Sequence, residues 1–302
     1  MGRIVDQSAP AERLAAFRIA VGVFVVVYLV GRSPVFLGLA DRRAVDFDPV
    51  GLLSAMGEPP PTVLVPVAVA LTVASAAAAT IGWRHRITGV AAALGVLFLT
   101  TLRSSWGQLL HFENLMALQL IIVALSPSAD AWSLDARAGR TRPDLAGVRY
   151  GWPLGLASLV MVVTYVIAGL AKLRYGGIEW IAGDTLRNHV AYSAARLDLI
   201  GGNAPILAEF IVRRAWVLPL FAFVAVAVEL SAPVVFVGAR SRNVWVAAAW
   251  LMHVGILVSM SVGFPSPLFG VAFAPLFPLE KLVVRGRGSL RRWVGSAGVG
   301  GV

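Results

Sequence analysis

Long apolar runs alternate with short polar segments along most of the chain. A membrane-spanning helix needs about 20 mainly apolar residues, because the hydrocarbon of a bilayer is roughly 30 Å thick and a helix rises about 1.5 Å per residue. Eight runs approach this length, and they cover residues 14–31, 62–82, 87–102, 109–126, 152–171, 216–238, 244–262 and 264–279. The pattern predicts an all-α integral membrane protein, a bundle of about eight transmembrane helices.

The first and last runs admit other interpretations. The first follows Arg3 and Arg13, as the apolar core of a signal peptide would, but its length and the seven runs after it favour a span. The last run is short and contains four prolines. We therefore expect it to be kinked, re-entrant or only partly inserted.

The polar segments between the runs predict loops and no soluble domain. The segment 173–215 is too long for a turn and predicts a long structured outer loop between spans five and six, with short helices or an interfacial segment. Trp180 and Tyr192 in this loop suit the level of the lipid headgroups. We expect residues 1–302 to form a single transmembrane domain, with a basic cytoplasmic tail at 281–302.

Composition excludes several classes of protein. With 58% hydrophobic and 14% charged residues and a mean hydropathy of +0.79, the chain is neither a water-soluble enzyme nor a nucleic-acid-binding module. It has no cysteine, which excludes disulfides and cysteine-ligated metals. In the eight-span topology, 15 Lys and Arg residues lie on the side of the termini and nine on the other. The positive-inside rule then predicts a multi-pass protein of a bacterial-type plasma (inner) membrane with both termini in the cytoplasm.

Four ionisable residues lie within or at the ends of the apolar runs, where charge is costly and often functional: His111, Lys172, Glu229 and His253. Lys172 is one of only two lysines in the chain. Desolvation can drive a lysine to the neutral amine, which can accept a proton, whereas arginine stays protonated. Lys172 is therefore competent as a general base. The alternative is a side chain that reaches to the outer interface and does nothing else.

Topology groups these residues into two pairs. His111 opens the fourth run and Lys172 closes the fifth, so both are expected near the outer face, where a shared site is geometrically allowed. Glu229 and His253 lie at similar depth, as a polar pair that orients helices or as a proton relay, with Arg18 as a counter-charge for Glu229.

The boundary of the fourth run adds Trp106, Glu113 and Asn114 as supporting residues. His111 and Glu113 are two positions apart on a helix and face different directions, and the chain has only four histidines, so we expect no metal site.

Three segments together resemble the HTTM domain, the membrane domain shared with vitamin K-dependent gamma-glutamyl carboxylase. They are HFENLMALQLIIVALSPSADAWSLD at 111–135, YVIAGLAKLRYGGIEWIAGDTLRNHV at 165–190 and ELSAPVVFVGARSRNVWVAAAWLMHVGILVSMSVGFPSPLF at 229–269. The resemblance implies that Lys172 is the base that deprotonates a vitamin K-like hydroquinone and that His111 assists. It also places Tyr165 and Trp180 in matching positions of the second segment.

The resemblance implies a reduced quinone as substrate or cosubstrate. The carboxylase has a long extra-membrane portion that recognises a propeptide, and no segment of comparable size follows the last run here. We therefore expect oxygenation of a quinol or another hydrophobic small molecule, and not protein gamma-carboxylation. The alternatives are a non-catalytic membrane subunit that binds a partner protein, and a small transporter with a water-filled path past Glu229 and His253.

Overall fold

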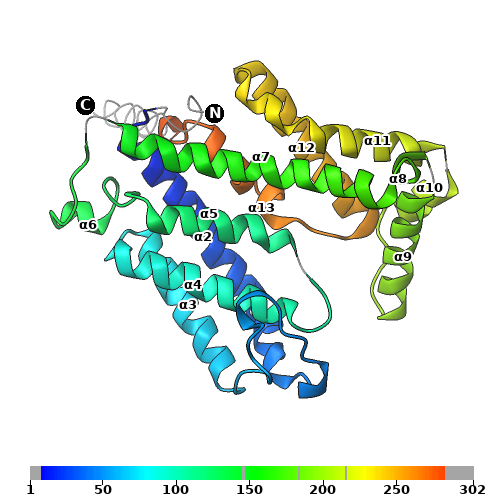
Figure 1. Ribbon diagram of the computed structural model, residues 1–302, viewed down its shortest axis with the longest axis horizontal. Coiled ribbons are helices and arrows are strands. Elements are labelled where there is room, and N and C mark those ends of the chain that lie inside the picture. The colour runs from blue at the N-terminus through cyan, green and yellow to red at the C-terminus, as the bar shows by residue number, and fades with distance from the viewer. Residues whose placement is uncertain (1–7, 110, 145–146, 183, 215, 283–302) are drawn as a thin grey trace, which may run out of the picture. The chain divides into compact units, whose positions relative to one another are not determined.

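The computed structural model describes residues 8–109, 111–144, 147–182, 184–214 and 216–282, and within them all regular elements are helical (Figure 1). The chain forms two compact units. Unit 1 comprises Met1–Ala157 and Ala274–Val302, and unit 2 comprises Ser158–Phe273. Helix α7 (Val148–Gly176) runs from the first unit into the second.

Unit 1 is built on a four-helix bundle. Its helices are α2 (Ala11–Leu37), α3 (Leu64–Thr80), α4 (His85–Ser104) and α5 (Asn114–Leu125). Helix α2 packs against α3 and α5, and α4 packs against the same two helices. Small residues allow the close approach, because a Cβ atom on Gly22 of α2 would overlap the Thr80 side chain of α3.

Short elements connect the helices of unit 1. They are η1 (Gly38–Asp41), η2 (Ala44–Asp46), η3 (Gly51–Leu53), η4 (His111–Glu113) and α6 (Leu134–Arg137). Of the predicted basic tail, residues 283–302 lie outside the described residues.

Unit 2 contains the second part of α7 and the helices that follow it. These are α8 (Glu179–Ala182), α9 (Thr185–Leu199), α10 (Ala208–Arg213), α11 (Val217–Leu230), η5 (Ala232–Phe236), α12 (Ala239–Met260) and α13 (Pro265–Leu268). Helix α12 packs against α9, α10, α11, α13 and η5. The segment predicted as a long outer loop thus carries three helices, α8 to α10.

Four helices are long and apolar enough to cross a membrane: Ala11–Asp41, His85–Ser104, Arg149–Gly176 and Ala239–Met260. Three shorter apolar helices occupy further predicted spans: Leu64–Thr80, His111–Leu125 and Val217–Leu230. The all-helical, membrane-type fold is confirmed, and the count of eight spans stays a prediction. Exposed apolar side chains such as Val27, Leu71 and Leu251 are suited to contact with lipid.

The last predicted span is not one continuous helix. It is divided into α13 (Pro265–Leu268) and the 3₁₀ helix η6 (Val271–Leu276), with Gly270 at a positive φ of 74° between them. Pro265 and Pro267 lie in the first turn of α13, where proline is tolerated, whereas Pro275 inside η6 lacks the backbone donor that a continuous α-helix needs.

Candidate functional site

Lys172 forms an ion pair with Glu229 inside unit 2. Its Nζ donates to Glu229 Oε1 at 2.6 Å, from α7 to α11. The Lys172 side chain is 23% exposed and that of Glu229 is 8% exposed. Charge-assisted hydrogen bonds of this length are among the stronger contacts in a protein, and burial strengthens them further.

Gly169 makes this contact possible. Tyr165, Gly169 and Lys172 are spaced by four and three positions, so they share one face of α7. A Cβ atom at Gly169 would lie 2.9 Å from Leu230 and 3.1 Å from the Glu229 Cβ. Glycine at position 169 therefore favours the close approach of α11 that brings the carboxylate within reach of the lysine.

Trp180 covers the lysine from α8. The Lys172 Nζ lies 5.5 Å from the centre of the Trp180 ring, a cation–π distance. On its other side the indole lies 5.6 Å from the His189 ring of α9. Trp180, expected from the sequence at the headgroup level, thus contacts the candidate base directly.

An aromatic cluster lines the same face of α7. Tyr165 contacts Trp245 edge-to-face at 4.9 Å, His253 at 5.7 Å and Phe273 at 6.3 Å between ring centres. His253 also packs against Phe264 at 5.2 Å. Edge-to-face packing of this kind fixes ring orientation. Tyr165 and His253 therefore belong to one buried aromatic cluster in unit 2.

The hydrogen-bond partners of His253 and Glu229 differ from the Glu229–His253 pair and the Arg18 counter-charge that the sequence predicts. His253 Nδ1 donates to the Ala249 carbonyl of its own helix at 2.7 Å, and Trp245 Nε1 donates to the Val228 carbonyl at 2.8 Å. The counter-charge of Glu229 is Lys172, and not Arg18 as the sequence analysis expected.

Three buried polar atoms near Lys172 have no hydrogen-bond partner among the described residues: the Tyr165 hydroxyl, the Trp180 indole nitrogen and Glu229 Oε2. Native proteins leave few buried polar atoms unpaired. Tyr165, Trp180 and Glu229 therefore provide two hydrogen-bond donors and one acceptor that the protein itself does not use. All three residues are candidates on sequence grounds, but no residue pattern indicates that these atoms would be unpaired.

The other predicted site residues lie in unit 1. Glu113 is buried and accepts hydrogen bonds at Oε1 from Tyr28 of α2 and, at 2.6 Å, from Arg103 Nη1 of α4. Trp106 packs against Phe47, with ring centres 5.2 Å apart. Tyr28 and Arg103 were missed, because an ion pair between a helix end and a turn has no sequence signature.

His111 and Asn114 are exposed and line a cavity of unit 1. His111 therefore belongs to unit 1, whereas Lys172 belongs to unit 2. A site shared by the two stays a prediction.

Arg18 holds a loop of unit 1 through backbone carbonyls. Its guanidinium is 1% exposed. It donates to the carbonyl oxygens of Thr80 at 3.3 Å, Ala131 at 3.2 Å and Trp132 at 2.6 Å, and also to that of Ser128. These bonds fix the segment that leads into the Trp-Ser-Leu-Asp turn at 132–135, which ends the first of the three segments that resemble the HTTM domain.

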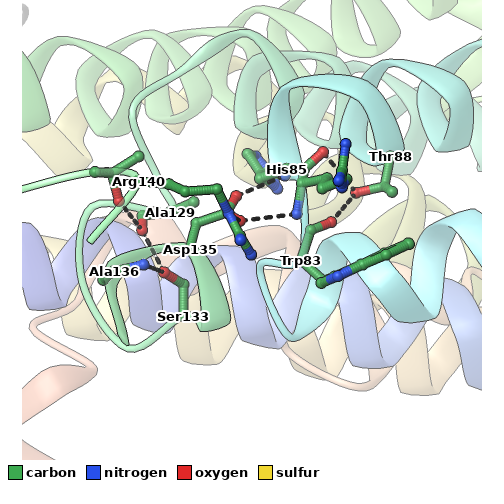
Figure 2. Close-up of polar contacts among 10 residues, drawn as sticks. Trp83, His85, Thr88, Ala129, Ser133, Asp135, Ala136 and Arg140 are labelled. Atoms are coloured by element: carbon green, nitrogen blue, oxygen red, sulfur yellow. Dashed lines mark hydrogen bonds and ion pairs between the residues drawn. The ribbon is translucent and has the colours of Figure 1, made fainter. Parts of the chain in front are cut away.

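The acid of that turn caps helix α4, as Figure 2 shows. Asp135 accepts the backbone N–H groups of Arg84 at 2.9 Å and His85 at 2.8 Å, and the Arg140 side chain at 2.8 Å. Burial would raise the pKa of Asp135, but these three donors together hold it below its ordinary value. The turn therefore has a structural role at the start of a predicted span.

Comparison with known proteins gives one result. A family model described as the HTTM domain matches residues 7–280, which is most of the chain. Neither the curated proteins nor the solved structures give a significant match.

Proposed function

Because the chain belongs to the HTTM domain family, we propose that it is a membrane enzyme that oxygenates a quinol or a similar lipid-soluble phenol, with Lys172 as the base. The family model covers the helices of both units, so the polytopic membrane character belongs to the chain as a whole. The substrate and the reaction are the proposal.

The observation that carries the proposal is the hydrogen bond of the half-buried Lys172 amine to the Glu229 carboxylate. In the proposed reaction, the Lys172 ammonium of the ion pair first releases one proton to solvent. The neutral amine then takes the proton of a substrate hydroxyl: the O–H bond breaks, an N–H bond forms and a phenolate remains. The ammonium that forms is stabilised by Glu229 at 2.6 Å. Molecular oxygen is the co-reactant, and quinol plus oxygen yields quinone epoxide plus water.

The surroundings of Lys172 suit a quinol. Trp180 is only partly buried and offers a flat aromatic contact beside Lys172, whereas Tyr165 and Trp245 are buried and pack edge-to-face against each other. The unpaired Tyr165 hydroxyl and Trp180 nitrogen are donors for a phenolate oxygen, and Glu229 Oε2 is an acceptor for a hydroxyl group. His111 stays in the proposal as an assisting acid or base.

The decisive experiment supplies the purified protein with reduced menaquinone or reduced vitamin K and with oxygen, and follows epoxide and quinone formation. We expect Lys172→Ala to reduce the rate at least about 100-fold, as is typical when a general base is lost. The matched control is Lys281→Ala, which removes the only other lysine from an exposed position. Equal rates for the wild type and Lys172→Ala would remove Lys172 as the base.

A wild-type protein that turns over none of these quinols would favour the alternative, a non-catalytic membrane subunit whose polar residues hold helices together. In that case Lys172→Ala is expected to change stability or partner binding only. Measuring unfolding for the same variants separates the two functions.

We also propose that both termini face the cytoplasm of a plasma-membrane protein. The natural chain has no cysteine, so each introduced cysteine is the only labelling site. A membrane-impermeant maleimide applied to intact cells should label Val45→Cys and Leu199→Cys, which are 82% and 85% exposed in the native residues. It should leave Ser8→Cys and Arg142→Cys unlabelled. The reverse pattern would overturn this orientation.

A further inference from the structure

We propose that a cavity in unit 1 binds a lipid that has a hydrocarbon chain and an uncharged head bearing a hydroxyl or carbonyl group. The cavity measures about 530 Å³, within the range of about 300–1,000 Å³ typical of small-molecule sites. Its walls come from the second half of α4, from η4 and the start of α5, and from Val50 and Gly51 at η3.

Most hydrogen-bonding side chains of the cavity lie at one end, where the apolar Val50 also lies, since its N–H donates to Ser105. Leu109, two residues before His111, is a further apolar residue of the lining. Along α4 its lining changes from Leu97 to Ser104, and along α5 from Asn114 to Leu118. Helices α4 and α5 pack against each other and are joined by residues 105–113, so their polar positions lie at the same end, with His111. The seven-residue step from Leu97 to Ser104 spans about 10 Å along the helix axis. A lipid that lies along these helices has the same order of parts, a polar head at one end and a hydrocarbon chain at the other.

The polar end is built for an uncharged head. The side chains there are the hydroxyls of Thr101 and Ser104, the His111 imidazole and the Asn114 amide, and no Lys, Arg, Asp or Glu is among the described residues that line the cavity. Arg103 and Glu113 lie close in sequence but form an ion pair with each other at 2.6 Å. A phosphate head would be desolvated here without a paired cation, which is costly.

The same ion pair holds the polar end in place. Glu113 is the last residue of the η4 turn that presents His111, and both Arg103 of α4 and Tyr28 of α2 bind its carboxylate. The turn is therefore fixed before a ligand arrives, and a preformed site loses less entropy on binding. This cavity shares His111 with the proposed function but involves neither Lys172 nor turnover. Binding measured without oxygen or reductant therefore fails or succeeds independently of the proposed enzyme activity.

The test is equilibrium binding to the full chain in phosphatidylcholine nanodiscs, without oxygen or reductant. The two probes are a tritiated diacylglycerol and a tritiated prenylated quinone, which carry the same head chemistry from two sources. We expect saturable binding of one molecule per chain for at least one of them, and no competition from phosphatidylglycerol in excess. Equal competition by phosphatidylglycerol, or no saturable binding of either probe, would overturn the proposal.

Two variants locate the binding. Leu118→Trp fills the apolar end and should weaken binding about tenfold or more, and Asn114→Leu removes a hydrogen-bonding group and should weaken it about fivefold. The matched control is Leu94→Trp, a substitution on α4 at a position that is 60% exposed and does not line the cavity. Equal affinities of Leu118→Trp and Leu94→Trp would place the ligand elsewhere. If Leu118→Trp does not fold, unchanged binding by folded Asn114→Leu would likewise refute this site.

Discussion

Lys172 and Glu229 are 57 positions apart in the sequence, yet their side chains meet at 2.6 Å between α7 and α11. Gly169, one turn before the lysine, provides the space for this contact. Among the described residues, Glu229 is the carboxylate that pairs with the candidate base Lys172. Stability and the proposed chemistry thus depend on the same two residues. Suitable variants can separate the effect on stability from the effect on turnover.

Glu229→Gln keeps the shape of the side chain but removes the counter-charge of Lys172. We expect unfolding free energy to fall by roughly 2 kcal/mol, less than the roughly 3–5 kcal/mol for a fully buried pair, because the Lys172 side chain remains 23% exposed. Denaturation by SDS in mixed micelles measures this change. Glu209→Gln is the control, since Glu209 forms an exposed ion pair with Arg213 at 2.7 Å. A loss no larger than that of the control would contradict a structural contribution from the pair.

The double variant Lys172→Met, Glu229→Leu replaces both charges with apolar side chains of similar size. Because no unpaired charge is left in a buried place, we expect stability within about 1 kcal/mol of the wild type, or above it. Quinol turnover should nevertheless stay at the level of Lys172→Ala. Unfolding and turnover are measured on the same preparation. Wild-type turnover in this folded double variant would show that neither residue takes part in proton transfer.

Gly169→Ala tests whether the close approach of α11 is needed. The added methyl group would lie 2.9 Å from the end of the Leu230 side chain and 3.1 Å from the Glu229 Cβ, so these side chains or the helices must shift. We expect a loss of about 1–3 kcal/mol, typical of overpacking, together with reduced turnover. Gly255→Ala on α12 is the control, because a Cβ atom there meets no atom within 4 Å. If Gly169→Ala and Gly255→Ala have equal stability and equal turnover, the close approach of α11 to α7 at Gly169 is not needed for either property.

The sequence was sufficient to locate most helices but not to choose their partners. Apolar length fixes which segments can enter a bilayer, and seven predicted spans coincide with apolar helices. Depth along the membrane was the only argument for pairing Glu229 with His253, and depth does not determine which way a helix faces. Arg18 shows the same limit, since its acceptors are backbone carbonyls that no residue pattern reveals.

Asp135→Asn should make stability less dependent on pH. The folded pKa of Asp135 lies below its ordinary value, so its contribution is fully present above about pH 4 and is lost as the pH falls through the folded pKa. At pH 7 we expect the variant to lose about 1–2 kcal/mol, typical of a helix cap. The difference from the wild type should shrink below about pH 4.

Unfolding measured from pH 3 to pH 7 provides the comparison for Asp135. The control is Asp46→Asn, whose carboxylate pairs with Arg43 on the surface, where both side chains are more than half exposed. Its effect should be small at every pH, because exposed ion pairs contribute little to stability. A constant difference between wild type and Asp135→Asn across this pH range would rule out the charge of Asp135 as the cause.

Arg18→Met should release the loop that precedes α6. The substitution leaves the carbonyl groups of Thr80, Ser128, Ala131 and Trp132 without the donor that they share. We expect a loss of about 3 kcal/mol or more, since each unpaired buried carbonyl costs about 1–3 kcal/mol. Arg18→Lys keeps the charge but lacks the planar guanidinium group, so it should recover only part of that loss.

Cleavage of residues 126–133 by proteinase K measures release of the loop, and thermal unfolding measures the loss of stability. The control Arg13→Met also removes a positive charge from α2, together with the ion pair to Glu280 at 2.9 Å. If both methionine variants leave the loop equally protected, Arg18 does not hold it.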